Sequence, residues 1–141
     1  FLHRNANAEQ ITAKLVHHKI LAVDLHGNQD NLHRKKAIDA FRKALANVLI
    51  ASDIAARGLD IIGVSHVFNF DIPTQSKDYL HRVGRSSRAG SPGYAISLVT
   101  TQELRLIKRY IKELDITIHA ARLDRGTFII NNPIVDPSST L

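Results

Sequence analysis

Short apolar runs that end in turn residues alternate with amphipathic segments along most of this chain. The apolar runs have the length and composition of buried strands, and the segments between them repeat apolar residues at helical spacing. Strands that alternate with helices form a mainly parallel sheet with helices on both faces, so the pattern predicts a doubly wound α/β domain. Functional residues in such domains gather at the carboxyl ends of the strands. The expected strands are 20–27, 47–52, 64–71 and 93–100, and the expected helices are 6–18, 30–45, 74–85 and 101–114.

The expected helices have apolar faces that we predict to point inward. The turn-rich segment 53–63 is predicted to hold a single helical turn. Prolines and small polar residues in 126–141 predict an extended or disordered tail, so the expected domain covers residues 1–125. The residues expected to face inward are Ala8, Ile11, Leu15 and Val16 in the first helix, Leu32, Ala37, Ile38, Phe41 and Leu45 in the second, and Leu104, Ile107, Tyr110, Ile111 and Leu114 in the last.

Composition narrows the class of protein. With 141 residues, 44% of them hydrophobic, the chain is long enough for one domain with its own core. A formal net charge of +6 favours polyanionic partners. The chain has no cysteine, which excludes disulfides and thiolate metal sites, and no apolar run approaches the ~18 residues of a membrane span. It also has no methionine and opens on Phe-Leu, so we expect a fragment of a longer chain that begins partway along a strand.

The segment "ASDIAARGLDI", residues 51–61, comes directly off an apolar strand and carries two carboxylates, an arginine and a glycine. Gly58 would let the backbone approach a ligand closely, and the Ser52 hydroxyl can donate to a phosphate oxygen. Asp60 could accept hydrogen bonds from sugar hydroxyls. The alternative is an ordinary strand-to-helix loop that is capped by Asp53.

The segment "LHGNQDNLHR", residues 25–34, places a glycine between a strand and the start of a helix. Free backbone N–H groups at a helix start can bind an anion. A plain turn that is followed by a basic helix is the alternative.

Three arginines stand at three-residue intervals in "DYLHRVGRSSRAG", residues 78–90. Positions three apart lie on nearly the same face of a helix, so Arg82, Arg85 and Arg88 would form a compact cationic ridge. The guanidinium group matches phosphate oxygens bidentately, which indicates a polyphosphate or nucleic-acid phosphate site. The alternative is a solvated basic helix face.

In this order and spacing, the three segments resemble the DEAD-box RNA helicases, and specifically the second, C-terminal RecA-like domain of their two-domain core. The resemblance covers residues 1 to about 115. "ASDIAARGLD" is similar to the family's motif V, with serine where threonine is commoner. The family's motif VI, H-R-x-G-R-x-x-R, is matched at every fixed position by His81, Arg82, Gly84, Arg85 and Arg88.

The resemblance implies that ATP binds in the cleft between two RecA-like domains, where Arg85 and Arg88 reach the γ-phosphate as arginine fingers. It implies that Arg82 braces motif V through an acidic partner, which we expect to be Asp53. Asp60 is expected to contact the ATP ribose. His81 would connect the arginine segment with the N-terminal domain, and a neutral structural histidine is the alternative.

RNA is the second partner that the resemblance implies, together with the N-terminal RecA-like domain of the same protein. The sugar-phosphate backbone is expected to contact the chain without sequence specificity. The sequence has neither a G-x-x-x-x-G-K-[ST] phosphate loop nor a D-E-A-D tetrapeptide, so ATP and Mg²⁺ would be held mainly by the N-terminal domain, and we expect no ATPase activity from this chain alone. The expected RNA-binding residues are Gly27, Arg34, Ser52, Arg57 and Gly58.

Two other classes of protein fit parts of the sequence. A DNA helicase of the same superfamily would share the arginine fingers and the sheet, although "ARGLD" joined to "HRVGRSSR" favours the RNA branch. A non-enzymatic RNA-binding module is disfavoured because few aromatic residues, 6%, leave little for base stacking. The segment "KELDITIHAARLDRG" is most similar to bacterial members of the family, which suggests a protein of the bacterial cytoplasm. A nucleolar protein is the alternative that composition leaves open.

Overall fold

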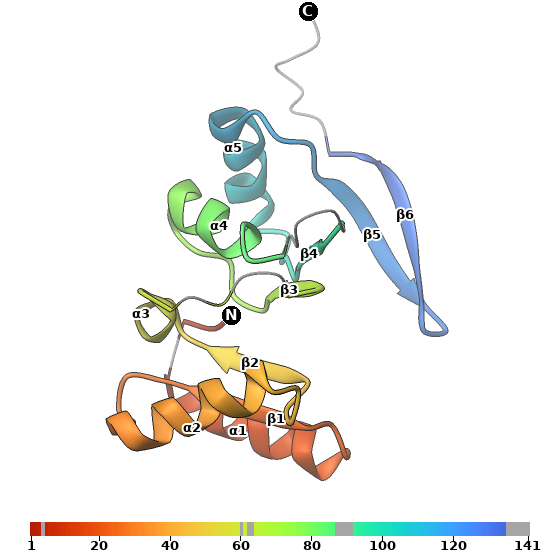
Figure 1. Ribbon diagram of the computed structural model, residues 1–141. Helices are drawn as coiled ribbons and strands as arrows, with labels where there is room; N and C mark the ends of the chain where they lie inside the picture. Colours follow the sequence, from red (N-terminus) through yellow and green to blue (C-terminus); the bar gives the residue numbers. More distant parts are fainter. Residues whose placement is uncertain (4, 60, 62–63, 87–91, 135–141) are drawn as a thin grey trace, which may run out of the picture.

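A computed structural model describes residues 1–3, 5–59, 61, 64–86 and 92–134 of the chain (Figure 1). Helices and strands alternate as the sequence predicts, up to the last two strands. Within these residues, no helix combines the length and apolar character needed to cross a bilayer. The elements are α1 (Asn5–His17), β1 (Ala22–Leu25), α2 (Asn31–Arg42), β2 (Val48–Ala51), α3 (Asp53–Ala56), β3 (His66–Asn69), α4 (Ser76–Val83), β4 (Tyr94–Ser97), α5 (Leu104–Leu114), β5 (His119–Asp124) and β6 (Thr127–Pro133).

The first residues of the chain join two parallel strand pairs, β1–β2 and β3–β4. On one side, Leu2 N donates to Ala51 O at 3.1 Å, and Leu2 forms a parallel bridge with Ser52. On the other side, Phe1 N donates to Phe68 O at 2.6 Å and Phe1 O accepts from Phe70 N at 3.1 Å. Phe1 thus bonds to Phe68 and Phe70, the residues on either side of Asn69, and this is the hydrogen-bond pattern of parallel strands. Residues 1–2 therefore connect the carboxyl end of β2 with that of β3.

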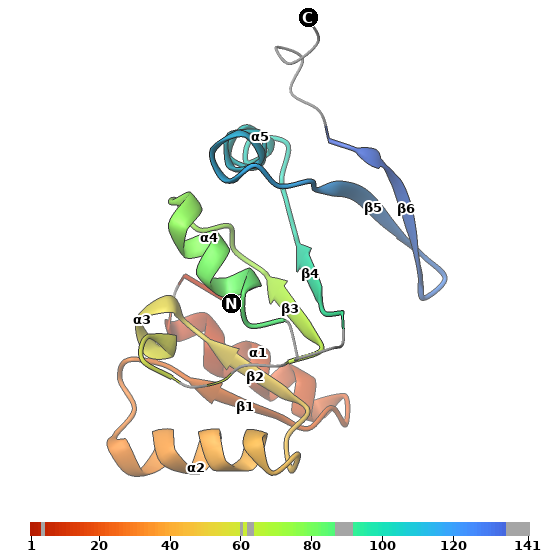
Figure 2. The same ribbon diagram turned by 45° about the horizontal axis from the view of Figure 1, so that its top comes forward.

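Successive side chains of β2 pack against helices on opposite faces, as the two-unit period of a strand requires. Val48 and Ile50 pack on the α1 side, whereas Leu49 and Ala51 pack on the α2 side. Figure 2 shows β1 and β2 between α1 and α2. The predicted doubly wound α/β architecture with helices on both faces is thereby confirmed. The helix residues in these contacts are Ala8, Ile11 and Leu15 of α1, and Ala37 and Ile38 of α2.

A second core lies between α4 and α5, where Tyr79, Ile107 and Tyr110 are buried together with Ile72. The Tyr110 hydroxyl donates to Pro73 O, so α5 holds the loop that leads from β3 to α4. Directly before α5 (Leu104–Leu114), the Glu103 carboxylate closes the turn that begins at Thr100. Thr100 N and Oγ1 donate to Glu103 Oε2 at 2.9 and 2.7 Å. These two hydrogen bonds lower the pKa of the Glu103 carboxyl below its usual value.

Three residues that we expected to face inward are exposed: Val16, Leu32 and Leu45. For Leu45 the reason is local, because α2 ends at Arg42 and Ala44 has a left-handed backbone with φ of 55°. The chain therefore turns away before Leu45 can continue the apolar face of the helix. Leu32 lies in the first turn of α2, one turn ahead of the residues that pack on β1 and β2.

An antiparallel hairpin of β5 and β6 follows α5, and it extends away from the rest of the chain in Figure 1. Its two-residue loop, Arg125 and Gly126, has φ values of 49° and 83°. Two positive φ angles are the signature of the tight turn that matches the twist of a hairpin. Within the segment 126–141, which we expected to be an extended or disordered tail, residues 127–133 form the extended strand β6. This strand pairs with β5, on the other side of the turn at Arg125 and Gly126. Residues 135–141 lie outside the described residues.

Burial separates two apolar residues that the sequence treats alike. Ile107 is 1% exposed in the α4–α5 core, so Ile107→Ala should lower the free energy of unfolding of this chain by about 2–5 kcal/mol. Leu45 is 66% exposed, and Leu45→Ala should change it by less than about 0.5 kcal/mol. Urea unfolding that is followed by circular dichroism measures both values. Equal losses for the two variants would contradict the packing described here.

Candidate functional site

The loops with the predicted site residues follow the carboxyl ends of parallel strands. Gly27 comes two residues after β1, Ser52 directly after β2, and Asp71 two residues after β3. Since residues 1–2 tie the end of β2 to the end of β3, these loops share one edge of the structure. This edge is where α/β domains bind their ligands.

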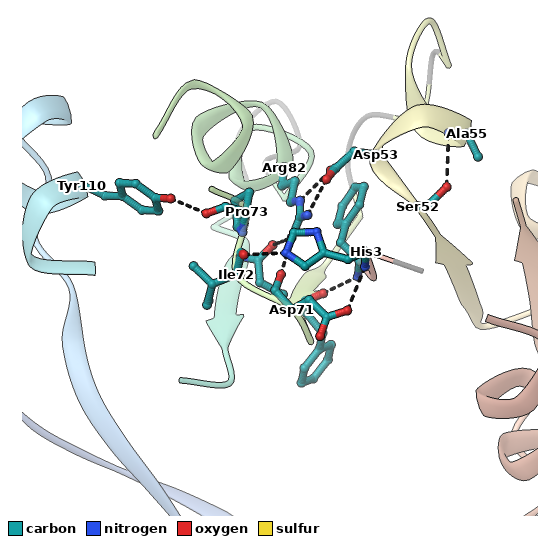
Figure 3. Close-up of polar contacts among 12 residues, drawn as sticks. His3, Ser52, Asp53, Ala55, Asp71, Ile72, Pro73, Arg82 and Tyr110 are labelled. Atoms are coloured by element: carbon teal, nitrogen blue, oxygen red, sulfur yellow. Dashed lines mark hydrogen bonds and ion pairs between the residues drawn. The ribbon is translucent and has the colours of Figure 1, made fainter. Parts of the chain in front are cut away.

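Arg82 of α4 makes four hydrogen bonds across this edge (Figure 3). Its Nε and Nη2 atoms donate to the two carboxylate oxygens of Asp53 at 2.7 and 2.6 Å. Its Nη1 atom donates to Asp71 O at 2.6 Å and to Asn69 Oδ1 at 3.3 Å. A bidentate arginine–carboxylate pair is the strongest and most directional of the ion pairs in proteins. Arg82 thus fixes α4 to the start of α3 and to the end of β3.

The Arg82 guanidinium is shielded from water as well as paired. The Arg82 side chain is 2% exposed and that of Asp53 is 26% exposed. The Phe1 ring covers the group, with its centroid 5.1 Å from the guanidinium carbon. A charge with so little exposure is tolerated because its donors are satisfied, and removal of one partner would leave an uncompensated charge.

His3 contacts the loop that follows β3, which Arg82 also holds through Asp71 O. The sequence analysis did not single out His3. His3 N donates to Asp71 Oδ2 at 2.8 Å, and its Nε2 atom lies 2.8 Å from Ile72 O. Figure 3 shows the imidazole beside the bonds of Arg82. Asn69 and Asp71 were missed too. The available signal was that these two polar residues stand two positions apart at the end of a strand, where residues i and i+2 point to the same face.

Arg85 holds the end of the segment 53–61, and Arg82 holds its beginning at Asp53. Its Nη1 atom donates to Leu59 O at 2.7 Å and to Ile61 O at 3.5 Å. Val64 N donates back to Arg85 O at 3.1 Å. The two arginines, three residues apart, therefore clamp the loop 53–61 at both ends.

The remaining predicted nucleotide residues are less defined. His81 is exposed on α4, on the same helix as Arg82. Arg88 and Asp60 lie outside the described residues.

Four of the predicted RNA-binding residues surround α3. Ser52 is buried and caps the helix, because its Oγ atom accepts from Ala55 N at 3.4 Å. Arg34 Nη2 donates to Ala55 O at 3.1 Å, which ties α2 to α3. Arg57 and Gly58 are exposed after the helix, and Gly58 has the positive φ of 73° that a side chain would disfavour. The fifth residue, Gly27, is exposed in the turn after β1.

The described part of the chain has no cluster of metal-ligating side chains, and the cavity beside Arg85 is mainly apolar. No group of three or more His, Cys, Asp or Glu side chains there could hold a metal ion. A cavity of about 1050 Å³ borders Arg85, but aliphatic and aromatic side chains such as Ile50 and Phe68 form most of its lining. A triphosphate would find few polar partners in it.

Comparisons with known proteins identify the class to which this fold and site belong. Residues 1–90 match the family described as helicase conserved C-terminal domain. The chain belongs to that family, and its fold is that of the C-terminal, RecA-like domain of DEAD-box proteins.

Curated relatives support this family from bacteria and fungi. The chain is 44% identical over 115 residues to the DEAD-box ATP-dependent RNA helicase RhpA of Helicobacter pylori, covering 82% of the chain and 23% of the relative. It is 38% identical over 139 residues to the ATP-dependent rRNA helicase RRP3 of Eremothecium gossypii, covering 99% of the chain and 29% of the relative. The chain thus spans about a quarter of the length of these relatives.

Solved structures agree with the fold. The C-terminal domain of the DEAD-box protein Dbp5 superposes with a TM-score of 0.75 at 34% identity, covering 81% of this chain and 68% of that chain. The E. coli DEAD-box protein SrmB superposes with a TM-score of 0.73 at 41% identity, covering 79% of this chain and 67% of that one.

The pairing of Arg82 with Asp53 predicts a coupled loss of stability. Arg82→Ala should lower the free energy of unfolding by about 2–4 kcal/mol. This loss is slightly smaller than that expected for a fully buried ion pair, because the Asp53 side chain is 26% exposed. In a double-mutant cycle, Asp53→Ala should add little once Arg82 is gone, which gives a coupling of about 1–3 kcal/mol. Urea unfolding of the four proteins measures the cycle. The exposed Arg57→Ala is the matched control, and additive losses would show that the two side chains do not interact.

Proposed function

We propose that this chain is the C-terminal half of the core of an ATP-dependent RNA helicase. In this role it supplies arginine fingers and RNA-backbone contacts for ATP-driven, local unwinding of short RNA duplexes. The observation that carries the proposal is that Arg82 and Arg85 hold the two ends of the segment 53–61. These bonds connect the arginine segment, proposed to bind ATP, with a segment that is proposed to bind RNA. A Saccharomyces cerevisiae Dbp5 variant that is 34% identical has been solved bound to RNA and ADP BeF3.

Arg85 and Arg88 are proposed to face the γ-phosphate of ATP across the cleft with the N-terminal RecA-like domain. There a water molecule attacks the γ-phosphorus and ADP leaves, and the guanidinium groups stabilise the charge that develops on the transferring oxygens. Mg²⁺, when bound to the N-terminal domain, neutralises charge on the β- and γ-phosphates. His81 would adjoin the partner domain, and Asp60 would accept from the ribose hydroxyls.

Arg85 could bind a phosphate without giving up its contacts in the structure. Its hydrogen bonds to described residues use the Nη1 atom, which donates to the carbonyls of Leu59 and Ile61. The guanidinium fork has further N–H groups on Nε and Nη2, which match the oxygens of a phosphate. Arg82 and Arg85 would then continue to hold the two ends of the segment 53–61.

RNA is proposed to lie over Gly27, Arg34, Ser52, Arg57 and Gly58 with its sugar-phosphate backbone. Arg57 is the exposed cation of this set, and Gly27 and Gly58 leave room for a phosphate next to the main chain. Ser52 is buried as the cap of α3, so its part would be to aim the N–H groups of that loop. Arg34 would act from its bond to Ala55 O.

The arginine-finger role predicts a large loss of hydrolysis without loss of folding. In the full-length helicase, Arg88→Lys keeps the positive charge but loses the planar fork, so RNA-stimulated kcat should fall by about 10²-fold or more. Phosphate release under saturating ATP and RNA measures the change. Lys77→Ala, an exposed substitution on α4, is the control and should keep wild-type turnover. An Arg88→Lys enzyme with normal kcat would remove Arg88 from the γ-phosphate site.

The phosphate-contact role predicts a change in salt dependence. In full-length protein, Arg57→Ala should weaken binding of single-stranded RNA and reduce the slope of log K against log salt by about 0.7–0.9. Fluorescence anisotropy from 50 to 200 mM salt gives the slope. Sequence-matched DNA in the same assay tests the alternative of a DNA helicase, because RNA contacts include the 2′-hydroxyl. An unchanged slope would exclude a phosphate contact by Arg57.

A further inference from the structure

A buried histidine stands directly beside the turn proposed to bind RNA. His26 follows β1, precedes Gly27 and is 5% exposed. Its Nε2 atom lies 3.1 Å from Glu9 Oε1 of α1 and 3.2 Å from Asp24 Oδ2 of β1. His26 belongs to the segment 25–34, but its partners Glu9 and Asp24 lie outside that segment.

The surroundings define how the imidazole is held. A carboxylate oxygen only accepts hydrogen bonds, so the Nε2 atom that faces two of them must carry a hydrogen. The Nδ1 atom is buried and has no hydrogen-bond partner among the described residues. A buried ring with an unmade bond is unusual in a native structure. The contacts with Glu9 and Asp24 are therefore the polar interactions that orient the ring.

The same residues close the turn that carries Gly27. Gln29 Nε2 donates to Asp24 Oδ2 at 2.8 Å, and His26 N donates to Gln29 Oε1 at 3.3 Å. Gln29 N donates in turn to His26 O at 3.3 Å. Asp24 thus accepts from both ends of the turn 26–29, and Glu9 links that turn to α1.

We propose that His26 is a positioning residue for RNA binding, which fixes the Gly27 turn relative to α1 through Glu9 and Asp24. The inference rests on the proposed function, because it takes the Gly27 turn as a contact for the RNA backbone. A turn that is already fixed loses less freedom when a phosphate binds, so the contact favours affinity.

The Glu9 contact has a second effect on a polyanion. The Glu9 side chain is 68% exposed, and a carboxylate that points toward a bound phosphate chain would repel it. Its bond to the His26 Nε2–H group draws one carboxylate oxygen toward the protein. Loss of the ring would release the Glu9 side chain as well as the turn.

The test uses the full-length helicase, a fluorescein-labelled single-stranded oligouridylate and a non-hydrolysable ATP analogue. His26→Leu keeps an apolar side chain but removes the donor, and should weaken RNA binding about 5–10-fold. Because no phosphate contact is lost, the slope of log K against log salt should stay at the wild-type value. His26→Gln places an amide donor near the Nε2 position and should restore the affinity to within about 2-fold. His18→Leu, an exposed substitution at the other end of α1, should bind as wild type.

Two further measurements separate positioning from folding. In RNA-stimulated ATPase assays, His26→Leu should raise the half-saturating RNA concentration by the same factor while kcat at saturating RNA stays within about 2-fold. Should His26→Leu fail to fold, Glu9→Ala at an exposed position replaces it, and amide hydrogen exchange of residues 27–29 should then accelerate while that of β2 does not. Unchanged exchange would overturn the proposal.

The outcomes distinguish the inference from the function on which it rests. Wild-type protein that does not bind the oligouridylate would overturn the proposed function. Wild-type protein that binds, together with a folded His26→Leu protein of equal affinity, would overturn the role of His26 alone. A weakened His26→Leu protein that His26→Gln does not rescue would show that packing of the ring matters rather than its donor, and would overturn the proposal too.

Discussion

The nearly inaccessible guanidinium of Arg82 is the interaction on which the arrangement of this domain depends. Its donors reach Asp53 at the start of α3 and Asn69 and Asp71 at the end of β3, while the side chain itself comes from α4. Elements distant in sequence are thereby fixed to one group. A fixed, buried cation can be accommodated only where acceptors surround it, so the positions of the strand ends and of the ion pair determine one another.

Around this group, the two parallel strand pairs act as a frame because residues 1–2 hydrogen-bond to both. The β1–β2 pair lies between α1 and α2, and α5 fixes the loop after β3 through Tyr110. The strand ends, with the loops that follow them, are thus held from the core side by apolar packing and from the edge by Arg82. Most of the proposed site residues lie in loops, and rigid elements determine where each loop begins.

Much of this fold could be predicted from the sequence, since alternating strand and helix periods dictate a parallel α/β sheet. The predicted ridge of three arginines on one helix face was wrong, because Arg82 is buried and α4 ends at Val83, before Arg85. The phosphate site that the arginine spacing indicates stays a prediction. The misses have physical causes. A left-handed turn at Ala44 removed Leu45 from its helix face, and the hairpin pairing of β5 and β6 around the positive-φ turn at Arg125 and Gly126 was not anticipated. The bonds of Arg85 to the carbonyls of Leu59 and Ile61 could not be predicted, because backbone acceptors have no residue signature. His3 and His26 were missed because their partners lie far away in sequence or on another element.

The hold that main-chain carbonyls have on Arg85 also has a thermodynamic consequence. A free arginine side chain has about 2 kcal/mol of rotamer entropy to lose when it is ordered. Here the hydrogen bonds to Leu59 O and Ile61 O restrict the Arg85 side chain before any ligand arrives. Both bonds use the Nη1 atom, so the Nε and Nη2 donors would meet an anion on a side chain that is already ordered. The entropy that Arg85 loses on binding would therefore be small, and more of the energy of the new contacts would appear as affinity.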